Sequence, residues 1–155
     1  MGYSSSLRKA NYQFDLAALQ QLAAKNYAQL SRVLPAELAV DEQVTVAVGP
    51  LAYVLTVLEQ NAYSTLVNVS EQRHDDGEAL PAVKLGTDID IMMYHDARLA
   101  EVVRSQAKRG FLARYKQPNR HMHQVDEKRQ INVFLAEWLG LCLSQGHYAA
   151  LPTRL

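Results

Sequence analysis

The sequence predicts an α+β fold in which an antiparallel sheet of five to six strands, in a meander-like order, carries an N-terminal and a C-terminal helix packed on one face. Apolar residues recur every three or four positions near both ends of the chain and alternate with other residues between them. The segments between the predicted strands are too short for parallel crossovers. The 155 residues, 48% of them hydrophobic, predict a single domain over 1–155 with an ordered core of about 11–147.

Helical periodicity predicts the first helix between about Leu16 and Leu34. Leucine, alanine and tyrosine side chains recur there at threes and fours. Asp15 is a suitable N-cap for the first turn, and Pro35 ends the helix. We therefore expect a core-facing helix of about five turns.

The pattern changes to a period of two from Gln43 onward. It predicts strands over 43–48 and 53–58, joined by a turn at Gly49 and Pro50, and a third strand over 63–70 after a short turn at Gln60 and Asn61. The β-branched content of the third strand supports this prediction.

The second half of the predicted sheet follows a charged stretch over 71–82, which is expected to be a mobile surface loop because it combines charge with glycine and proline. Strands are predicted over 89–94 and 99–104, with His95, Asp96 and Ala97 at the hairpin turn between them. A sixth strand is predicted over about 110–115.

The closing helix is predicted over about 126–144. We expect Trp138 and Phe134 to face the sheet and to pack against Leu30 or Tyr27 of the first helix. The apolar stripe and the glycine that follows the helix are Ile131, Phe134, Leu135, Trp138, Leu139, Cys142 and Gly146.

The charges are balanced overall but not along the chain. Sixteen basic and sixteen acidic side chains cancel, whereas residues 36–103 have a net charge of −9 and residues 104–129 a net charge of +6. The basic segment suits an anionic small molecule, a nucleotide or an acidic protein partner; nucleic acid is a further alternative without a recognised motif. A solvated surface balanced by the acidic strands is the plainer interpretation. The residues of this basic patch are Arg104, Lys108, Arg109, Arg114, Lys116 and Arg120.

The single cysteine, Cys142, excludes an internal disulfide and is expected to be a core thiol. The N-terminus lacks the apolar core of a signal peptide, and no apolar run approaches the roughly 20 residues of a membrane span. These features predict a cytoplasmic protein without membrane contact. No phosphate-binding loop, Cys-x-x-Cys or His-Glu-x-x-His motif is present, and we expect no cofactor.

A metal site at His121 and His123 is the sharpest hypothesis that the residues allow. Two histidines two positions apart point the same way on a strand, and a stable site needs a third ligand such as Asp126 or Glu127. The spacing is a weak signal, so we expect no metal and interpret the pair as part of a polar loop.

His95 and Asp96 form an acid/base cluster with His123 if the strands bring them together, because histidine near a carboxylate transfers protons at neutral pH. Turn hydrogen bonds for Asp96 and helix capping by Asp126 explain the same residues without catalysis. The concentration of polar side chains before the last helix exceeds what capping requires and suggests a ligand-binding cluster. Its proposed ligand-binding residues are Tyr94, Arg114, Tyr115, Asn119, His123 and Lys128.

Short motifs with a recognisable pattern run from the first predicted helix to the last: Asn26-Tyr27, Leu30, Leu34-Pro35, Tyr63 to Val67, Tyr94 to Ala97, Ala100 to Val102, Ala113 to Tyr115, Pro118-Asn119, His123-Gln124, Asp126 to Lys128, Gln130 to Asn132, Phe134 to Ala136 and Trp138-Leu139. With these motifs the sequence resembles, over about residues 11–147, the YqiB-like family of small bacterial proteins of unknown function. The resemblance includes His123 but not His121. It implies no reaction, and no catalytic residue follows from it.

Two classes of function therefore remain. We favour a binding or regulatory module without turnover, which holds a partner or a small anionic ligand through the basic patch and the polar cluster. The alternative is a small hydrolase or transferase whose acid/base groups are His95, Asp96 and His123. An enzyme requires an open pocket in which these groups converge.

Overall fold

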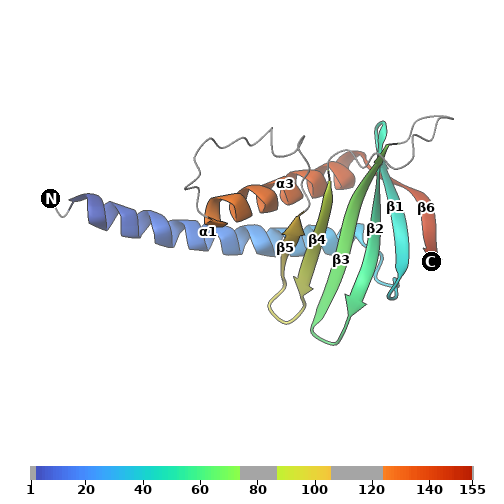
Figure 1. The fold of residues 1–155 in the computed structure, drawn as a ribbon, viewed down its shortest axis with the longest axis horizontal. Coiled ribbons are helices and arrows are strands. Elements are labelled where there is room, and N and C mark those ends of the chain that lie inside the picture. The colour runs from blue at the N-terminus through green and yellow to red at the C-terminus, as the bar shows by residue number, and fades with distance from the viewer. Residues whose placement is uncertain (1–2, 74–86, 106–123, 155) are drawn as a thin grey trace.

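The computed structural model describes residues 3–73, 87–105 and 124–154. Over these residues it contains two long helices and six strands, labelled in Figure 1. The elements are α1 (Tyr3–Val33), β1 (Glu42–Val48), β2 (Leu51–Gln60), β3 (Ser64–Arg73), β4 (Asp88–Tyr94), β5 (Leu99–Ser105), α3 (Gln124–Gln145) and β6 (His147–Arg154).

The strands form one antiparallel sheet in the order β5-β4-β3-β2-β1-β6. Strands β1 to β5 follow one another as a meander, and β6 returns to lie beside β1. Figure 1 shows α1 and α3 running side by side behind the same face of the sheet. The predicted α+β class, with both helices covering one face, is confirmed.

The sixth strand of the described sheet is β6, which the sequence patterns do not reveal. The strand predicted over 110–115 lies outside the described residues. β6 lacks a period of two, contains Pro152, and pairs with β1 through two register shifts. Proline supplies no backbone donor and is therefore tolerated at a sheet edge, where β6 lies. Tyr148 of this strand donates a hydrogen bond of 2.6 Å to the carbonyl oxygen of Val33, at the end of α1.

The start of α1 and the end of β3 differ most from the predicted boundaries. α1 begins at Tyr3, so Asp15 lies inside the helix and is not its N-cap. Residues 3–15 contain neither glycine nor proline, and the helix continues through them because nothing in their backbone interrupts it. β3 continues to Arg73 and takes up the first three residues of the predicted loop.

The turns that the sequence predicts are confirmed, except that Gln60 still belongs to β2 and the second turn begins at Asn61. Gly49 has a φ of +58° between β1 and β2, a conformation that glycine adopts without steric cost. Between β2 and β3, the side-chain oxygen of Asn61 accepts hydrogen bonds of 3.0 Å from the backbone N–H groups of Tyr63 and Ser64. The position after α3 requires a glycine, because a Cβ at Gly146 would lie only 2.6 Å from the carbonyl oxygen of Cys142.

The hydrophobic core lies between the helices and the sheet. The predicted stripe of α3 faces it: Trp138 is 3% exposed, and its indole meets the ring of Tyr53 edge to face at a centroid distance of 5.2 Å. Phe134 is only partly buried. Burial raises the pKa of the Cys142 thiol to about 12, as expected for a core cysteine. The fully buried aliphatic side chains are Leu30, Val44, Leu55, Val57, Val67, Val69, Ile89, Ile91, Leu135 and Leu139.

Asn132 of α3 closes the edge of the sheet at β5. Its side-chain oxygen accepts a 3.0 Å hydrogen bond from the backbone N–H of Val102, and its amide group donates to the carbonyl oxygen of Lys128 at 2.8 Å. Asn26 of α1 donates to the backbone carbonyl oxygen of Asn132 at 3.1 Å. These buried hydrogen bonds connect α1, α3 and β5, so that the edge strand and both helices hold one another.

Candidate functional site

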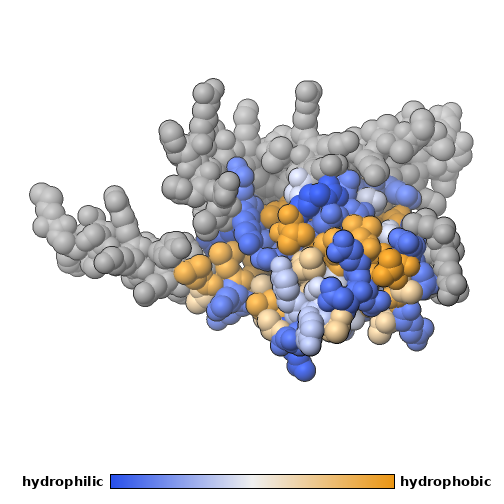
Figure 2. All heavy atoms as spheres, turned by 60° about the horizontal axis from the view of Figure 1, so that its bottom comes forward, coloured by the Kyte–Doolittle hydropathy of each residue, from blue (hydrophilic) through white to orange (hydrophobic). Residues whose placement is uncertain are grey.

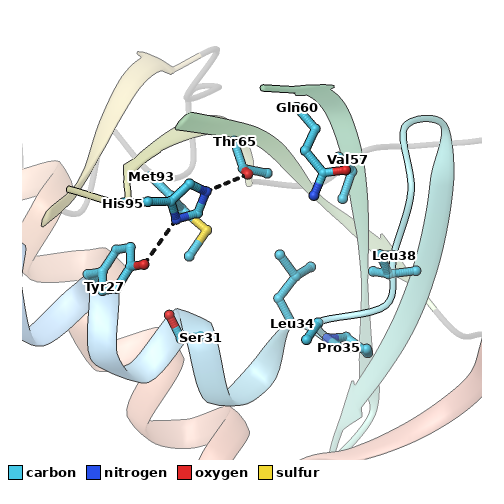
Figure 3. Close-up of a pocket in the computed structure, with 11 residues that line it drawn as sticks. Tyr27, Ser31, Leu34, Pro35, Leu38, Val57, Gln60, Thr65, Met93 and His95 are labelled. Carbon is cyan, nitrogen blue, oxygen red and sulfur yellow. Dashed lines mark hydrogen bonds between the residues drawn. The ribbon is translucent and has the colours of Figure 1, made fainter. Parts of the chain in front are cut away.

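A pocket of about 210 Å³ opens between the end of α1 and strands β2, β3 and β4 (Figure 3). It includes His95, the first residue after β4, which the sequence singles out as a candidate acid/base group. The lining residues are Tyr27, Ser31, Leu34, Pro35, Ala36, Leu38, Val57, Gln60, Thr65, Met93 and His95.

The imidazole of His95 is held between two hydroxyl groups. Its Nδ1 lies 3.0 Å from the hydroxyl of Tyr27, and its Nε2 lies 2.8 Å from the hydroxyl of Thr65. The Tyr27 and His95 rings also meet edge to face at 5.9 Å. The backbone N–H of His95 donates to the carbonyl oxygen of Tyr63 at 2.9 Å. Contacts on both ring nitrogens and on the backbone fix the position of the ring.

The pocket has one polar and one apolar side. Figure 3 shows Tyr27, His95 and Thr65 joined by hydrogen bonds on one side, with Leu34 and Leu38 across the space from them. Among the residues that the structure describes, the lining contains no aspartate, glutamate, lysine or arginine. A neutral imidazole offers one donor and one acceptor, which match two hydroxyl partners. Each hydroxyl can donate or accept, so both ring nitrogens have a matching partner.

Of the other predicted residues near this turn, none lines the pocket. Asp96 is exposed between β4 and β5. Tyr94 donates to Glu101 at 3.3 Å, and Lys128 forms an ion pair of 2.9 Å with the same carboxylate. Burial and the neighbouring Glu101 charge raise the pKa of the Tyr94 phenol. Tyr94 and Lys128 thus meet at a partly exposed ion pair at the edge of the sheet.

The remaining predicted site residues lie outside the described residues. The convergence of His95 with His123, the His121 pair, and a binding role for the basic patch therefore stay predictions. The residues concerned are Lys108, Arg109, Arg114, Tyr115, Lys116, Asn119, Arg120, His121 and His123.

Arg104 is the member of the basic patch that the structure describes, and it is paired. Its guanidinium lies 2.6 Å from Asp90 and 3.0 Å from Asp88, and Asn68 donates to both carboxylates at 2.8 and 2.9 Å. In register, Asn68 faces Asp90 and Asp90 faces Arg104, on the sheet face away from the helices. Because of these ion pairs, Arg104 neutralises acidic strand residues. Figure 2 views the molecule from the side of the hairpin turns, and hydrophobic and hydrophilic residues are mixed on that surface.

We expect acid to remove the stabilising contribution of Asp90. Burial disfavours its charge, but hydrogen bonds from Arg104 and Asn68 outweigh this effect and hold the pKa of the carboxyl below its usual value of 3.8. The contribution is then fully present above about pH 4 and is lost as the pH falls through the lowered pKa. The difference in free energy of unfolding between wild type and Asp90→Asn, measured by chemical denaturation, should shrink below that pH. A difference that stays constant into acid contradicts this, and Asp96→Asn at the exposed turn is the control.

Comparison with known proteins identifies the family. The sequence model described as "Protein of unknown function (DUF1249)" matches residues 29–148. The chain belongs to the DUF1249 family. It is 39% identical over 140 residues to the uncharacterized protein YqiB of Escherichia coli strain K12. The aligned residues make up 89% of this chain and 95% of that protein. YqiB of strains O6:H1 and O157:H7 gives the same identity and coverage. The predicted YqiB-like resemblance is confirmed, and no solved structure matches.

Sequence reasoning missed most of the residues around His95 in this DUF1249 chain. Tyr27 belongs to an apolar helix stripe and is taken for a core residue, and Ser31 and Gln60 carry no distinguishing pattern. One signal was available for Thr65. It occupies an inward-facing strand position in line with Val67, where a hydroxyl requires a partner.

Neither a metal cluster nor a membrane helix is found in the described part of the DUF1249 fold. Over residues 3–73, 87–105 and 124–154, histidine, cysteine, aspartate and glutamate side chains form no group of three or more placed to hold a metal ion. Within the same ranges, neither helix combines the length and the apolar character needed to span a bilayer.

Proposed function

We propose that this DUF1249 protein is a binding module whose ligand is a small organic molecule held in the pocket at His95. The observation that carries the proposal is the fixed row of Tyr27, His95 and Thr65 opposite an apolar wall. Binding sites for small molecules combine mostly apolar walls with a few polar groups that are held in place before the ligand arrives.

The polar row keeps capacity for a ligand although its members bind one another. A hydroxyl group has one donor and two acceptor positions. Tyr27 and Thr65 each use one of these on His95 and retain others. His95 therefore acts as the group that positions two hydroxyls.

The volume limits the size of the ligand. The pocket of about 210 Å³ is smaller than the roughly 300–1,000 Å³ usual for drug-sized molecules. It suits a compound with one ring or a short chain rather than a whole nucleotide. This proposal moves the site from the basic patch to the end of α1.

A second candidate, acyl transfer, is supported by one distance. The hydroxyl of Thr65 lies 2.8 Å from Nε2 of His95, and the other ring nitrogen is held by Tyr27, an arrangement that resembles a nucleophile, a base and an orienting group. Two features favour binding instead. Thr65 is only 3% exposed, and the orienting group is a neutral phenol rather than a carboxylate.

The test of the binding proposal is a fragment screen by amide chemical-shift mapping with one-ring compounds at millimolar concentration. We expect shifts to cluster at the lining residues and to disappear in Ser31→Phe, which fills the pocket from an exposed helix position. Ala28→Phe is the matched control, because Ala28 is exposed on the same helix and does not line the pocket. Shifts that persist unchanged in Ser31→Phe would place the ligand elsewhere.

Reaction with an activated ester separates the binding proposal from acyl transfer. An activated ester such as p-nitrophenyl acetate should leave no acyl group on Thr65 by mass spectrometry if the pocket only binds. A Thr65 adduct that is absent in Thr65→Val would support acyl transfer instead.

A further inference from the structure

We infer that the His95 pocket selects uncharged molecules that donate hydrogen bonds, of the primary carboxamide class, and rejects carboxylates of the same shape. The inference rests on the proposed function and adds the chemistry of the ligand. It follows from the way α1 ends and from the absence of acidic, lysine and arginine side chains among the described residues of the lining.

Pro35 removes the usual helical donor for one carbonyl oxygen at the end of α1. In an α-helix the carbonyl oxygen of each residue accepts the N–H four positions later. For Ser31 that position is Pro35, which has no N–H, and both residues line the pocket. Two neighbouring carbonyl oxygens of the last turn have partners, since Leu30 accepts from Leu34 at 2.8 Å and Val33 accepts from Tyr148. The helical partner that the Ser31 carbonyl lacks can be a ligand N–H.

The electrostatics of the helix end act in the same direction. The C-terminus of a helix carries a partial negative charge that attracts donors and disfavours anions. Arg32, the basic residue of the last turn, is exposed and does not line the pocket. A carboxylate in the pocket would therefore face the negative end of α1 with no lysine or arginine among the lining residues that the structure describes.

His95 has no ring nitrogen left to bond a carboxylate. Both ring nitrogens already contact hydroxyls, and a protonated ring would donate to Tyr27 and Thr65 rather than to a ligand. An anion would lose its hydration without a charged partner, which is costly. A carboxamide has donors for the Ser31 carbonyl and an acceptor for a hydroxyl, and an attached ring would lie against Leu34 and Val57.

Three probes of nearly equal shape test the selectivity on the wild-type protein. Benzamide carries amide donors, benzoate carries a negative charge, and acetophenone carries neither donor nor charge. In chemical-shift titrations at pH 7, we expect benzamide to bind at least about tenfold more tightly than benzoate and several-fold more tightly than acetophenone, as one well-placed hydrogen bond allows. Benzoate or acetophenone binding in the pocket as tightly as benzamide overturns the inference and leaves the proposed function standing. If none of the three probes causes chemical-shift changes at the pocket, the inference is overturned. If the wider fragment screen also finds no compound that binds there, the proposed function is overturned as well.

A proline variant tests the acceptor itself. Pro35→Ala restores an N–H that can bond to the Ser31 carbonyl, and we expect it to weaken benzamide binding about fivefold while benzoate is unaffected. Pro50→Ala, in the exposed β1–β2 turn outside the pocket, is the control. Slow hydrogen exchange at the amide that the Pro35→Ala substitution introduces shows that the new bond has formed. If that bond forms and benzamide affinity stays the same, the Ser31 carbonyl is not the acceptor and the inference fails. If Pro35→Ala does not fold, the comparison of the three probes on the wild-type protein decides whether the inference holds.

Discussion

Replacement of Trp138 by alanine is expected to lower the free energy of unfolding by about 3 to 5 kcal/mol, the range usual for buried aromatic residues. Trp138 is 3% exposed in the core between α3 and the sheet, and it also meets the ring of Tyr53 edge to face. The loss combines the transfer of a large apolar surface with the cavity left behind. Chemical denaturation monitored by circular dichroism measures it.

Trp138→Phe is the matched control for this experiment. The indole Nε1 is buried without a hydrogen-bond partner among the described residues, so phenylalanine removes an unpaired donor while it keeps an aromatic ring against Tyr53. We expect a loss below about 1.5 kcal/mol for this variant. Phe134→Ala should cost less than Trp138→Ala, because Phe134 is partly buried, whereas the sequence predicts equal roles for both. A loss under about 1 kcal/mol for Trp138→Ala would contradict the packing of α3 on the sheet.

Asn132→Ala should cost about 2 to 3 kcal/mol, because it leaves the buried N–H of Val102 without its acceptor and also removes the bond to Lys128. The effect should be local as well as global. In hydrogen-exchange measurements the Val102 amide is expected to lose protection more than the amides of central strand β3.

Ser144→Ala provides the comparison on the same helix. Ser144 is exposed and its hydroxyl bonds weakly, at 3.4 Å, to a neighbouring backbone carbonyl, so its loss should change stability by less than about 0.5 kcal/mol. Unchanged protection of Val102 in Asn132→Ala would show that the side chain does not close the edge of the sheet.

The sequence predicts those helices and strands whose own burial imposes a repeating pattern of apolar residues. α3 and strands β1 to β5 each bury one face, and this burial imposes the period of 3.6 or 2 on their residues. β6 is different, because its place depends on pairing with β1, about a hundred residues earlier, and its own residues show no alternation. The start of α1 is predicted too late because Asp15 is assigned as its N-cap, although Tyr3, Leu7, Ala10 and Phe14 already recur at threes and fours.

The candidate site shows the same division. A histidine at a hairpin turn is visible in the sequence, and His95 does line the pocket. Its partners are not visible, because Tyr27 and Thr65 lie 68 and 30 positions away in the sequence. Tyr27 reaches the ring only when α1 packs over the sheet, and Thr65 only when β3 pairs with β4. Arg104 was predicted as part of a binding face from local charge alone, and its pairing with Asp88 and Asp90 depends on strand register.

The hydrogen bond from Tyr148 to the end of α1 has a consequence for biosynthesis. It joins two residues that are 115 positions apart. On the ribosome, α1 and the five strands of the meander emerge before this tyrosine does. The last turn of α1, which forms one wall of the pocket, must wait for the final strand before its Val33 carbonyl is bonded. A nascent chain that lacks β6 would therefore lack this bond beside the pocket, so the proposed ligand binding would draw on a residue made after all those that line the site.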